Sequence, residues 1–102
     1  MDVLSVIRQG KRSFGGLIDI VFLKRRDQNP SEAKVVVSQK VAKKAVDRHK
    51  IQRRLREIVR HAFPAYPHAA HGYDMVVMAR PPAKQASFDE LRTTVHSILL
   101  RL

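Results

Sequence analysis

The strongest constraint on the fold is one segment that is both the most basic part of the chain and amphipathic. Residues 40–60 hold nine lysines and arginines, against only Asp47 and Glu57. Apolar residues recur through this segment at the spacing of a single helical stripe: Ile51, Leu55, Ile58, Val59 and Ala62. Such a stripe has to be covered, so we expect a long helix that packs on a sheet through one face and presents its charges on the other.

Short apolar, β-branched runs on either side of this segment predict the sheet. We expect strands at residues 17–23, 33–38 and 75–79, separated by turn-rich stretches. The chain has no internal repeat, low-complexity tract or linker. It is therefore expected to form a single α+β domain over residues 1–102, built as a two-layer α/β sandwich.

Two further helices are expected near the ends of the chain. One spans residues 3–9 and ends at Gly10, and the other spans 88–102, where Ser87 and Glu90 have the spacing of a capping box. The basic helix should end at residues 63–67, where two prolines forbid its continuation. Residues 68–72 are expected to form a loop.

Composition narrows the class of partner. The 102 residues carry 20 Lys+Arg against 9 Asp+Glu, a formal net charge of +11, which favours a polyanion and nucleic acid first. A hydrophobic content of 44% argues against disorder, and the lack of cysteine excludes disulfides and thiolate metal sites. No apolar run is long enough for a membrane span, and no secretory signal is recognisable. We therefore expect a cytoplasmic protein without a membrane partner.

The charged face of the basic helix suits nucleic acid best. Turning 100° per residue places His49, Arg53, Arg56 and Arg60 opposite the apolar stripe. Guanidinium groups repeat there once per turn of roughly 5.4 Å, close to the spacing of phosphates, which they bind bidentately. A solvated face would mix charges at i, i+4, and a stripe committed to a sheet is not free to enter a membrane or bind calmodulin.

No pattern in the chain predicts catalysis by protein side chains. The five histidines are scattered, and the acidic residues do not cluster in a way that would hold Mg²⁺. A stand-alone ribonuclease that uses histidines remains an alternative, and it predicts loss of cleavage in His49→Ala or His61→Ala. The prediction is that the protein contains neither a catalytic residue nor a metal ligand.

The run VSQKVAKKAVDRHKIQRRLREIVR, residues 37–60, closely resembles the signature of the bacterial ribonuclease P protein subunit. That family carries a Lys-rich lead-in and an Ala-Val pair, then Arg-Asn-Arg-x-x-Lys-Arg-x-x-Arg-Glu. The segments RQGK with Phe14, GYDMVVMARPPA and the terminal helix are also similar, so the resemblance covers essentially the whole chain. Three residues depart from the pattern: His49 replaces Asn, Lys50 replaces Arg, and Gln52 replaces a basic residue. Few turns precede the first helix, as in a compact member with a trimmed first helix.

The resemblance implies a four-stranded sheet with three helices, of the type found in the second domain of a small-subunit ribosomal protein. It also implies a fourth strand around residues 12–16 and an unusual left-handed βαβ crossover formed by the basic helix. The implied function is that of a protein partner of a catalytic RNA that removes the 5′ leader from precursor tRNA, with Mg²⁺ held mainly by the RNA. No obligate protein partner is expected. The alternative is a structural RNA-binding protein of ribosomal type with no role in cleavage.

Two RNA-binding surfaces follow from the resemblance. The residues expected to contact the catalytic RNA are Lys44, Arg48, His49, Lys50, Arg53, Arg56 and Arg60. The residues expected to line a cleft for the single-stranded leader are Phe14, Phe22, Lys34, Val36, Ser38 and Lys40. An aromatic platform with a basic rim suits unpaired nucleotides. A position in the core is at least as compatible with the sequence for Phe22 and Val36, because only one face of each strand can line the cleft.

Overall fold

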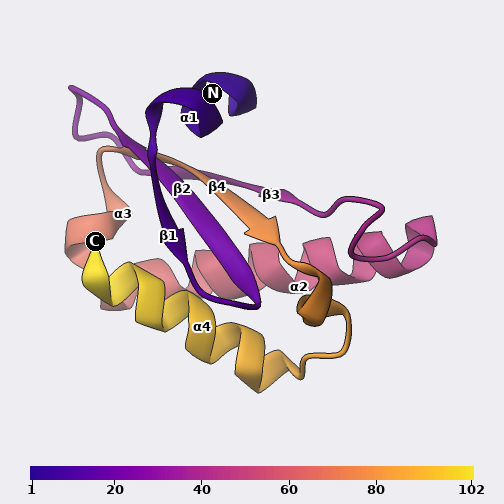
Figure 1. Ribbon diagram of the computed structural model, residues 1–102. Helices are drawn as coiled ribbons and strands as arrows, with labels where there is room; N and C mark the ends of the chain where they lie inside the picture. The colour runs from indigo at the N-terminus through magenta and orange to yellow at the C-terminus, as the bar shows by residue number, and fades with distance from the viewer.

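Four strands form one mixed sheet in the computed structural model, which describes residues 1–102 (Figure 1). They are β1 (Lys11–Phe14), β2 (Ile18–Lys24), β3 (Glu32–Val36) and β4 (Tyr73–Ala79), in the order β1-β2-β4-β3. The β1–β2 and β2–β4 pairs are antiparallel, whereas β3 and β4 are parallel. The expected four-stranded α+β fold is confirmed, and β1 is the strand that only the family resemblance implied.

The helices follow the expected pattern, with one addition. They are α1 (Val3–Gln9), α2 (Ala45–Ala62), α3 (Pro67–Ala70) and α4 (Phe88–Arg101). Short 3₁₀ turns occupy Phe63–Ala65 and Pro81–Lys84. The expectation of a loop at residues 68–72 is wrong in its first part, because α3 makes one helical turn there. Pro67 begins that turn, where its fixed φ suits a helix and its missing N–H costs nothing.

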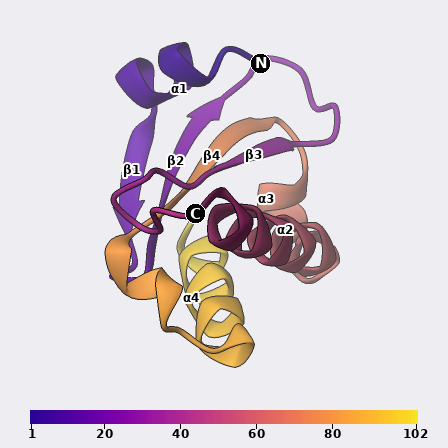
Figure 2. The same cartoon turned by 90° about the vertical axis from the view of Figure 1, so that its right-hand side faces the viewer.

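Helices cover both faces of the sheet, and the strand residues alternate between the two layers. Figure 2 shows α2 and α4 together on one face and α1 on the other. Ile18, Ile20 and Met75 face α2 and α4 in a core cluster of 18 buried residues. Val21 and Val76 point the opposite way and pack against Val6 of α1. The apolar stripe of α2 therefore belongs to the larger core, as its period predicts.

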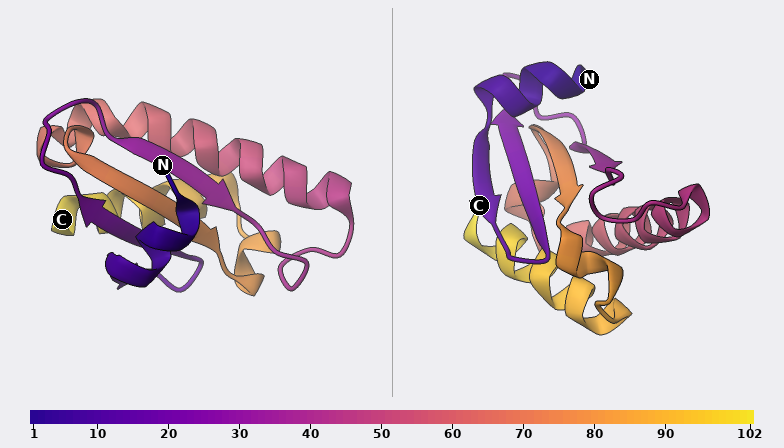
Figure 3. Two further views of the ribbon diagram at one scale, coloured as in Figure 1. Left: turned by 90° about the horizontal axis from the view of Figure 1, so that it is seen from above. Right: turned by 45° about the vertical axis from the view of Figure 1, so that its right-hand side comes forward.

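The crossover from β3 through α2 to β4 is left-handed. The left panel of Figure 3 views the sheet from the side of α1, with β3 and β4 both running to the right. In this view α2 lies on the far side of the sheet and returns to the left, and β4 lies below β3. A right-handed connection would place the helix on the near side, so this crossover is the rare hand that the resemblance implied.

Local contacts fix the two terminal helices. Ser87 Oγ accepts from the Glu90 N–H at 3.1 Å, and the Ser87 N–H donates to Glu90 Oε1 at 2.9 Å, which confirms the capping box of α4. A Cβ at Gly10 would lie 2.7 Å from the carbonyl oxygens of Phe22 and Val6, so only glycine lets the chain pass from α1 into β1 at this distance. None of the helices combines the length and the apolar character needed to cross a membrane.

Candidate nucleic-acid interface

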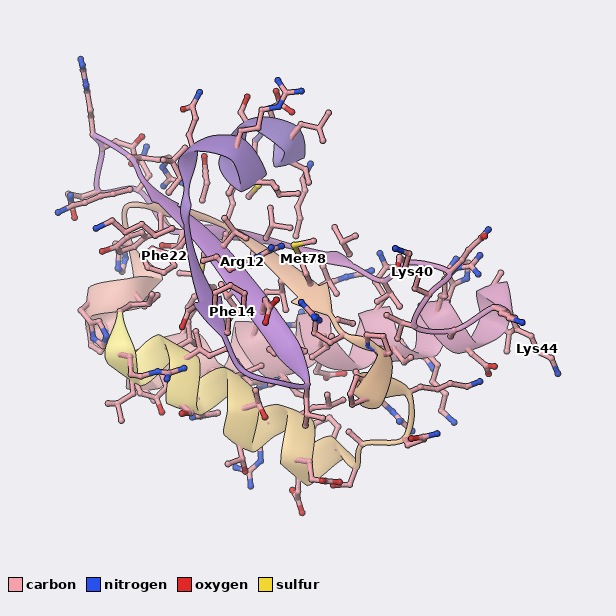
Figure 4. All side chains as sticks on the ribbon, in the orientation of Figure 1. Arg12, Phe14, Phe22, Lys40, Lys44 and Met78 are labelled. Atoms are coloured by element: carbon pink, nitrogen blue, oxygen red, sulfur yellow. The ribbon has the colours of Figure 1, made fainter.

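The outer face of α2 forms the first basic surface, and its two sides are divided as expected. Leu55 is 0% exposed and Ile51 5%, whereas His49, Arg53, Arg56 and Arg60 are exposed. Lys44 and Lys50 are also exposed, and Lys44 marks the start of the helix in Figure 4. The burial pattern confirms that the helix packs through its stripe and leaves its arginines accessible.

The three arginines lie close together with one acid among them. Arg53, Arg56, Glu57 and Arg60 line a shallow depression of about 220 Å³. Glu57 Oε1 lies 4.0 Å from Arg60 Nη2 and 3.7 Å from His61 Nε2, and all three side chains are more than half exposed. Exposed pairs of this kind contribute little and are screened by salt. The outer face of α2 therefore keeps a net positive charge available to phosphates.

Two polar side chains of α2 form hydrogen bonds within the protein: Arg48, which was predicted to contact RNA, and Gln52. Arg48 Nη1 donates to the carbonyl oxygens of Ala42 at 3.1 Å and Lys43 at 2.7 Å, which fixes the loop before the helix. Gln52 Nε2 donates to the Val35 carbonyl at 3.0 Å and so ties α2 to the edge strand β3. The glutamine that departs from the family pattern thus has a structural role here, and RNA contact by Arg48 stays a prediction.

The face of the sheet that carries α1 forms the second surface. Strand pairing places its side chains in rows across the sheet, and the row near the end of β4 is Phe14, Asp19, Met78 and Val36. The next row is Arg12, Val21, Val76 and Lys34. Helix α1 packs on Val21 and Val76 of this second row, whereas Phe14 at the edge of the first row remains 67% exposed. We call the first row, with Arg12 and Arg80 beside it, the open end of the sheet.

Three of the six predicted cleft residues share this face. Phe14, Lys34 and Val36 stand in the two adjacent rows, and Val36 is half-buried against the cluster under α1. Ser38 and Lys40 are exposed in the chain that leaves the end of β3, and Figure 4 shows Lys40 between Met78 and Lys44 in that view. Contact of these residues with a leader stays a prediction.

Phe22 does not join them, and its assignment to the cleft is wrong. In β2 it alternates with Val21 and therefore shares the opposite face with Ile18 and Ile20. There it is half-buried, with its ring edge-to-face with Tyr73 at a centroid separation of 6.0 Å. Phe22 therefore packs against the larger core, on the face opposite to the predicted cleft.

The open end of the sheet holds charged residues that the prediction missed. Asp19, only 2% exposed, accepts from Arg80 Nη1 at 2.9 Å, and Arg12 Nε lies 3.9 Å from the same carboxylate oxygen. The Arg12 guanidinium carbon is 5.8 Å from the centre of the Phe14 ring, and its Nη2 donates to Met78 Sδ at 2.9 Å (Figure 4). Arg12 precedes Phe14 by two residues, so recognising β1 would have placed both on one face.

Other charged residues serve the fold. Arg25 bonds Asp74 at 2.8 Å and Asp27 at 3.1 Å, and the bond to Asp74 raises the pKa of the Arg25 guanidinium above its usual value. It also donates to the carbonyl oxygens of Asn29 and Pro30, so it holds the loop between β2 and β3. Arg25 is thus committed to the protein in spite of its charge.

The two histidines of α2 lie apart. His49 and His61 are 12 residues apart on α2, about 18 Å along the helix axis, too far for an acid–base pair. His96 Nδ1 is 2.8 Å from the Tyr66 hydroxyl and His68 Nε2 is 2.9 Å from the Leu99 carbonyl. No group of three or more His, Asp and Glu side chains is gathered as a metal site.

The sequence of the whole chain matches a known family with this architecture. The model of the Ribonuclease P family matches residues 2–102. The chain belongs to this family. Among curated relatives, the ribonuclease P protein component of Kocuria rhizophila is 40% identical over 88 residues, which cover 85% of this chain and 73% of the relative. That of Symbiobacterium thermophilum is 34% identical over 95% of this chain and 81% of the relative.

Some relatives are matched over a shorter part. The Synechococcus ribonuclease P protein component is 36% identical over 70 residues, which cover 69% of this chain and 50% of the relative. The chain thus spans about half the length of some curated ribonuclease P proteins.

Solved structures show the same fold. The Thermotoga maritima ribonuclease P protein, in complex with 1-(4-fluorophenyl)-2-thiourea, has a TM-score of 0.85 and 28% identity, with 99% of this chain and 94% of that chain covered. A Staphylococcus aureus ribonuclease P protein has a TM-score of 0.74 at 16% identity, a likeness of fold alone, over 96% of this chain and 85% of that one.

Proposed function

We propose that this chain is the protein subunit of a ribonuclease P and assists the removal of the 5′ leader from precursor tRNA by a catalytic RNA. The observation that carries the proposal is the exposed arginine row of α2, in a chain whose residues 2–102 match the Ribonuclease P family. The complex would act in the cytoplasm.

The outer face of α2 binds the catalytic RNA. Arg53, Arg56 and Arg60 offer planar guanidinium groups that bind phosphate oxygens in pairs, and Lys44 and Lys50 add point charges at the start of the helix. Because α2 is anchored by a buried stripe, the arginines are carried on a rigid element. Binding of this type releases counterions and falls with salt.

The open end of the sheet binds the single-stranded leader. The exposed Phe14 ring, with Arg12 beside it, offers a stacking surface for an unpaired base. Lys34 on the opposite edge strand β3, and Lys40 in the chain that follows it, add positive charge for the leader backbone. A protein that holds the leader on one surface and the catalytic RNA on the other would raise the affinity of the complex for precursor over product.

Hydrolysis of the leader phosphodiester is assigned to the RNA and its Mg²⁺ ions. We place no Mg²⁺ ligand on the protein, whose acidic residues are paired with arginine or spread over the surface. The protein contributes positive charge, which screens the repulsion between two RNA molecules and lets the catalytic RNA work at lower Mg²⁺.

Reconstitution tests the proposal. The purified chain is mixed at low Mg²⁺ with precursor tRNA and the catalytic RNA of a bacterial ribonuclease P, and leader release is followed. We expect faster release than with the RNA alone, and less stimulation by the Arg53→Ala/Arg56→Ala variant. Arg92→Ala, an exposed arginine of α4, is the control and should stimulate normally.

Two results would overturn the proposal. Binding of the RNA without any stimulation would indicate a structural RNA-binding protein of ribosomal type. Cleavage of precursor tRNA by the protein without RNA, lost in His49→Ala or His61→Ala, would indicate a stand-alone ribonuclease.

A further inference from the structure

A buried carboxylate lies under the two arginines at the open end of the sheet. Asp19 is the one charged side chain in the buried part of the molecule, and its Oδ2 is approached by Arg80 at 2.9 Å and Arg12 at 3.9 Å. Its Oδ1 accepts the backbone N–H of Gly15 at 3.4 Å. The carboxylate is thus fixed by the β1–β2 turn on one side and faces both arginines on the other.

Both guanidinium groups reach solvent from this shared anchor. The Arg80 side chain is 49% exposed and the Arg12 side chain 37%, while Asp19 is covered. Arg80 uses a single N–H for Asp19, and Arg12 uses one for Met78 Sδ, so most of the ten guanidinium N–H groups have no hydrogen-bond partner in the protein. Two positive charges share one negative charge, and the cluster retains a net charge of +1.

This arrangement has the features of an ordered anion site. A free arginine loses about 2 kcal/mol of side-chain entropy when it is immobilised on a ligand. Here this side-chain entropy is already lost when the protein folds, because Asp19 and the Phe14 ring hold the two side chains in place. Ligand binding therefore has less entropy to lose. Since both approach the same carboxylate oxygen, the two arginines are close enough for one phosphate to bridge them.

The neighbouring ring identifies the ligand class. Phe14 pairs directly with Asp19 in the β1–β2 register, carries Arg12 over its face and is 67% exposed. A nucleotide joins a planar base to an anionic phosphate at a short distance, which matches a ring next to two arginines. An acidic peptide would supply the anion and leave the ring unused.

We propose that Asp19 is a positioning residue that holds Arg12 and Arg80 as a phosphate site, so that one nucleotide of single-stranded RNA binds with its phosphate between them and a base on Phe14. The proposal rests on the proposed function, in which the single strand is the 5′ leader. It adds Arg12, Arg80 and Asp19 to that surface and gives each a role.

Removal of the Asp19 charge tests the proposal directly. Asp19→Asn makes the surface more positive, so charge alone predicts tighter binding of leader-bearing precursor to the reconstituted complex. Loss of positioning predicts the opposite, a roughly 10-fold weaker affinity, the value of one charge-assisted hydrogen bond. The matched control is Asp89→Asn, which makes the same charge change beside Arg92 on α4 and should not weaken binding. Tighter or unchanged binding by Asp19→Asn would overturn the proposal.

A second variant keeps the test valid if Asp19→Asn does not fold. Arg80→Gln should also weaken precursor binding about 10-fold. This loss should disappear when one leader phosphate, found by scanning, is replaced by a neutral methylphosphonate, an effect that a structural role of Arg80 would not produce. A loss that persists at every leader position, or no loss at all, rejects the phosphate site.

The two levels of the proposal can fail separately. Wild-type complex that binds leader-bearing and leaderless tRNA equally would reject the leader-binding function itself. Wild-type complex that prefers the leader, together with variants that keep the same preference, would reject only the role of Asp19, Arg12 and Arg80.

Discussion

The two basic surfaces of this molecule hold arginines in different ways. On the outer face of α2, exposed arginines stand in a row with Glu57 as the one nearby acid, and no buried group orients them. At the open end of the sheet, Arg12 and Arg80 are anchored on the buried Asp19. The first surface thus has several positive charges whose side chains are free to move, and the second has two positive charges at fixed positions.

This difference suits the ligand that we propose for each surface. A row of free arginines adapts to a folded RNA backbone and depends on salt, since its attraction comes from many screened contacts. An anchored pair beside an aromatic ring suits one or two unpaired nucleotides and depends on geometry. Variants in each surface should separate the two, whereas a change in the core beneath them should disturb both.

Leu55→Ala should have the largest effect, because Leu55 lies under the arginine row and within the core that supports the sheet. It is 0% exposed, and truncation of such a leucine costs about 2–5 kcal/mol. The free energy of unfolding, measured by urea denaturation, should fall by this amount, and both RNA activities should weaken together. Leu100→Ala, at a leucine that is 66% exposed, is the control and should change it little. A similar loss in both variants would contradict the packing described for α2.

Replacement of Arg53, Arg56 and Arg60 by alanine should weaken the first surface alone. Each lost phosphate contact lowers the dependence of log affinity on log salt by roughly one, so the slope for the catalytic RNA should fall by about three. Urea denaturation should be unchanged within about 0.5 kcal/mol, as for other exposed positions. An unchanged slope would mean that this face of α2 remains in water in the complex.

Phe14→Ala should weaken the second surface alone. Loss of one stacked base costs about 1–3 kcal/mol, which should appear as weaker binding of leader-bearing precursor. Protein stability should hold, because the ring is largely exposed. Phe22→Ala is the matched control with the opposite expectation. Its free energy of unfolding should fall, and its affinity for leader-bearing precursor should stay at the wild-type value. If Phe22→Ala proved the more damaging to leader binding, the assignment of faces in β2 would be wrong.

Ser87→Ala should have the smallest effect and leave both surfaces intact at neutral pH. Loss of this N-cap costs about 1 kcal/mol in the free energy of unfolding. The Ser87 N–H and, less strongly, the Ser87 hydroxyl lower the pKa of the Glu90 carboxyl below its usual value, so Glu90 adds stability above its unfolded pKa and loses it as pH falls through the folded pKa. Ser87→Ala keeps the N–H and loses the hydroxyl. Denaturation at decreasing pH should show an acid-dependent loss in the wild type that is smaller in Ser87→Ala.

Local patterns predicted most of the fold and one of the two surfaces. The stripe and charges of α2 lie within one helix, so spacing alone defined its buried and exposed faces. Strand β1 was invisible to hydropathy, because Lys11, Arg12 and Phe14 are exposed on an edge strand. The left-handed crossover is a property of chain path, which residue spacing does not encode.

The open end of the sheet was harder to predict, because its residues meet only through strand pairing. Asp19 and Arg80 are 61 residues apart in the chain. Phe22 was misplaced for a related reason, since an apolar residue in β2 suits either face until its neighbours are known. From the sequence, Gln52 was interpreted only as the loss of a phosphate-binding charge. Its hydrogen bond to the Val35 carbonyl joins α2 to β3, a contact that helix spacing does not reveal.

Separate action of the two surfaces can be measured through the preference of the complex for leader-bearing tRNA. Catalytic RNA is saturated with wild-type protein, Phe14→Ala or Arg53→Ala/Arg56→Ala. The affinity of each complex is then measured for leader-bearing and for leaderless tRNA. The ratio of the two affinities should fall in Phe14→Ala and stay at the wild-type value in the arginine variant, although that variant needs more protein to reach saturation. Equal loss of the ratio in both variants would contradict separate surfaces.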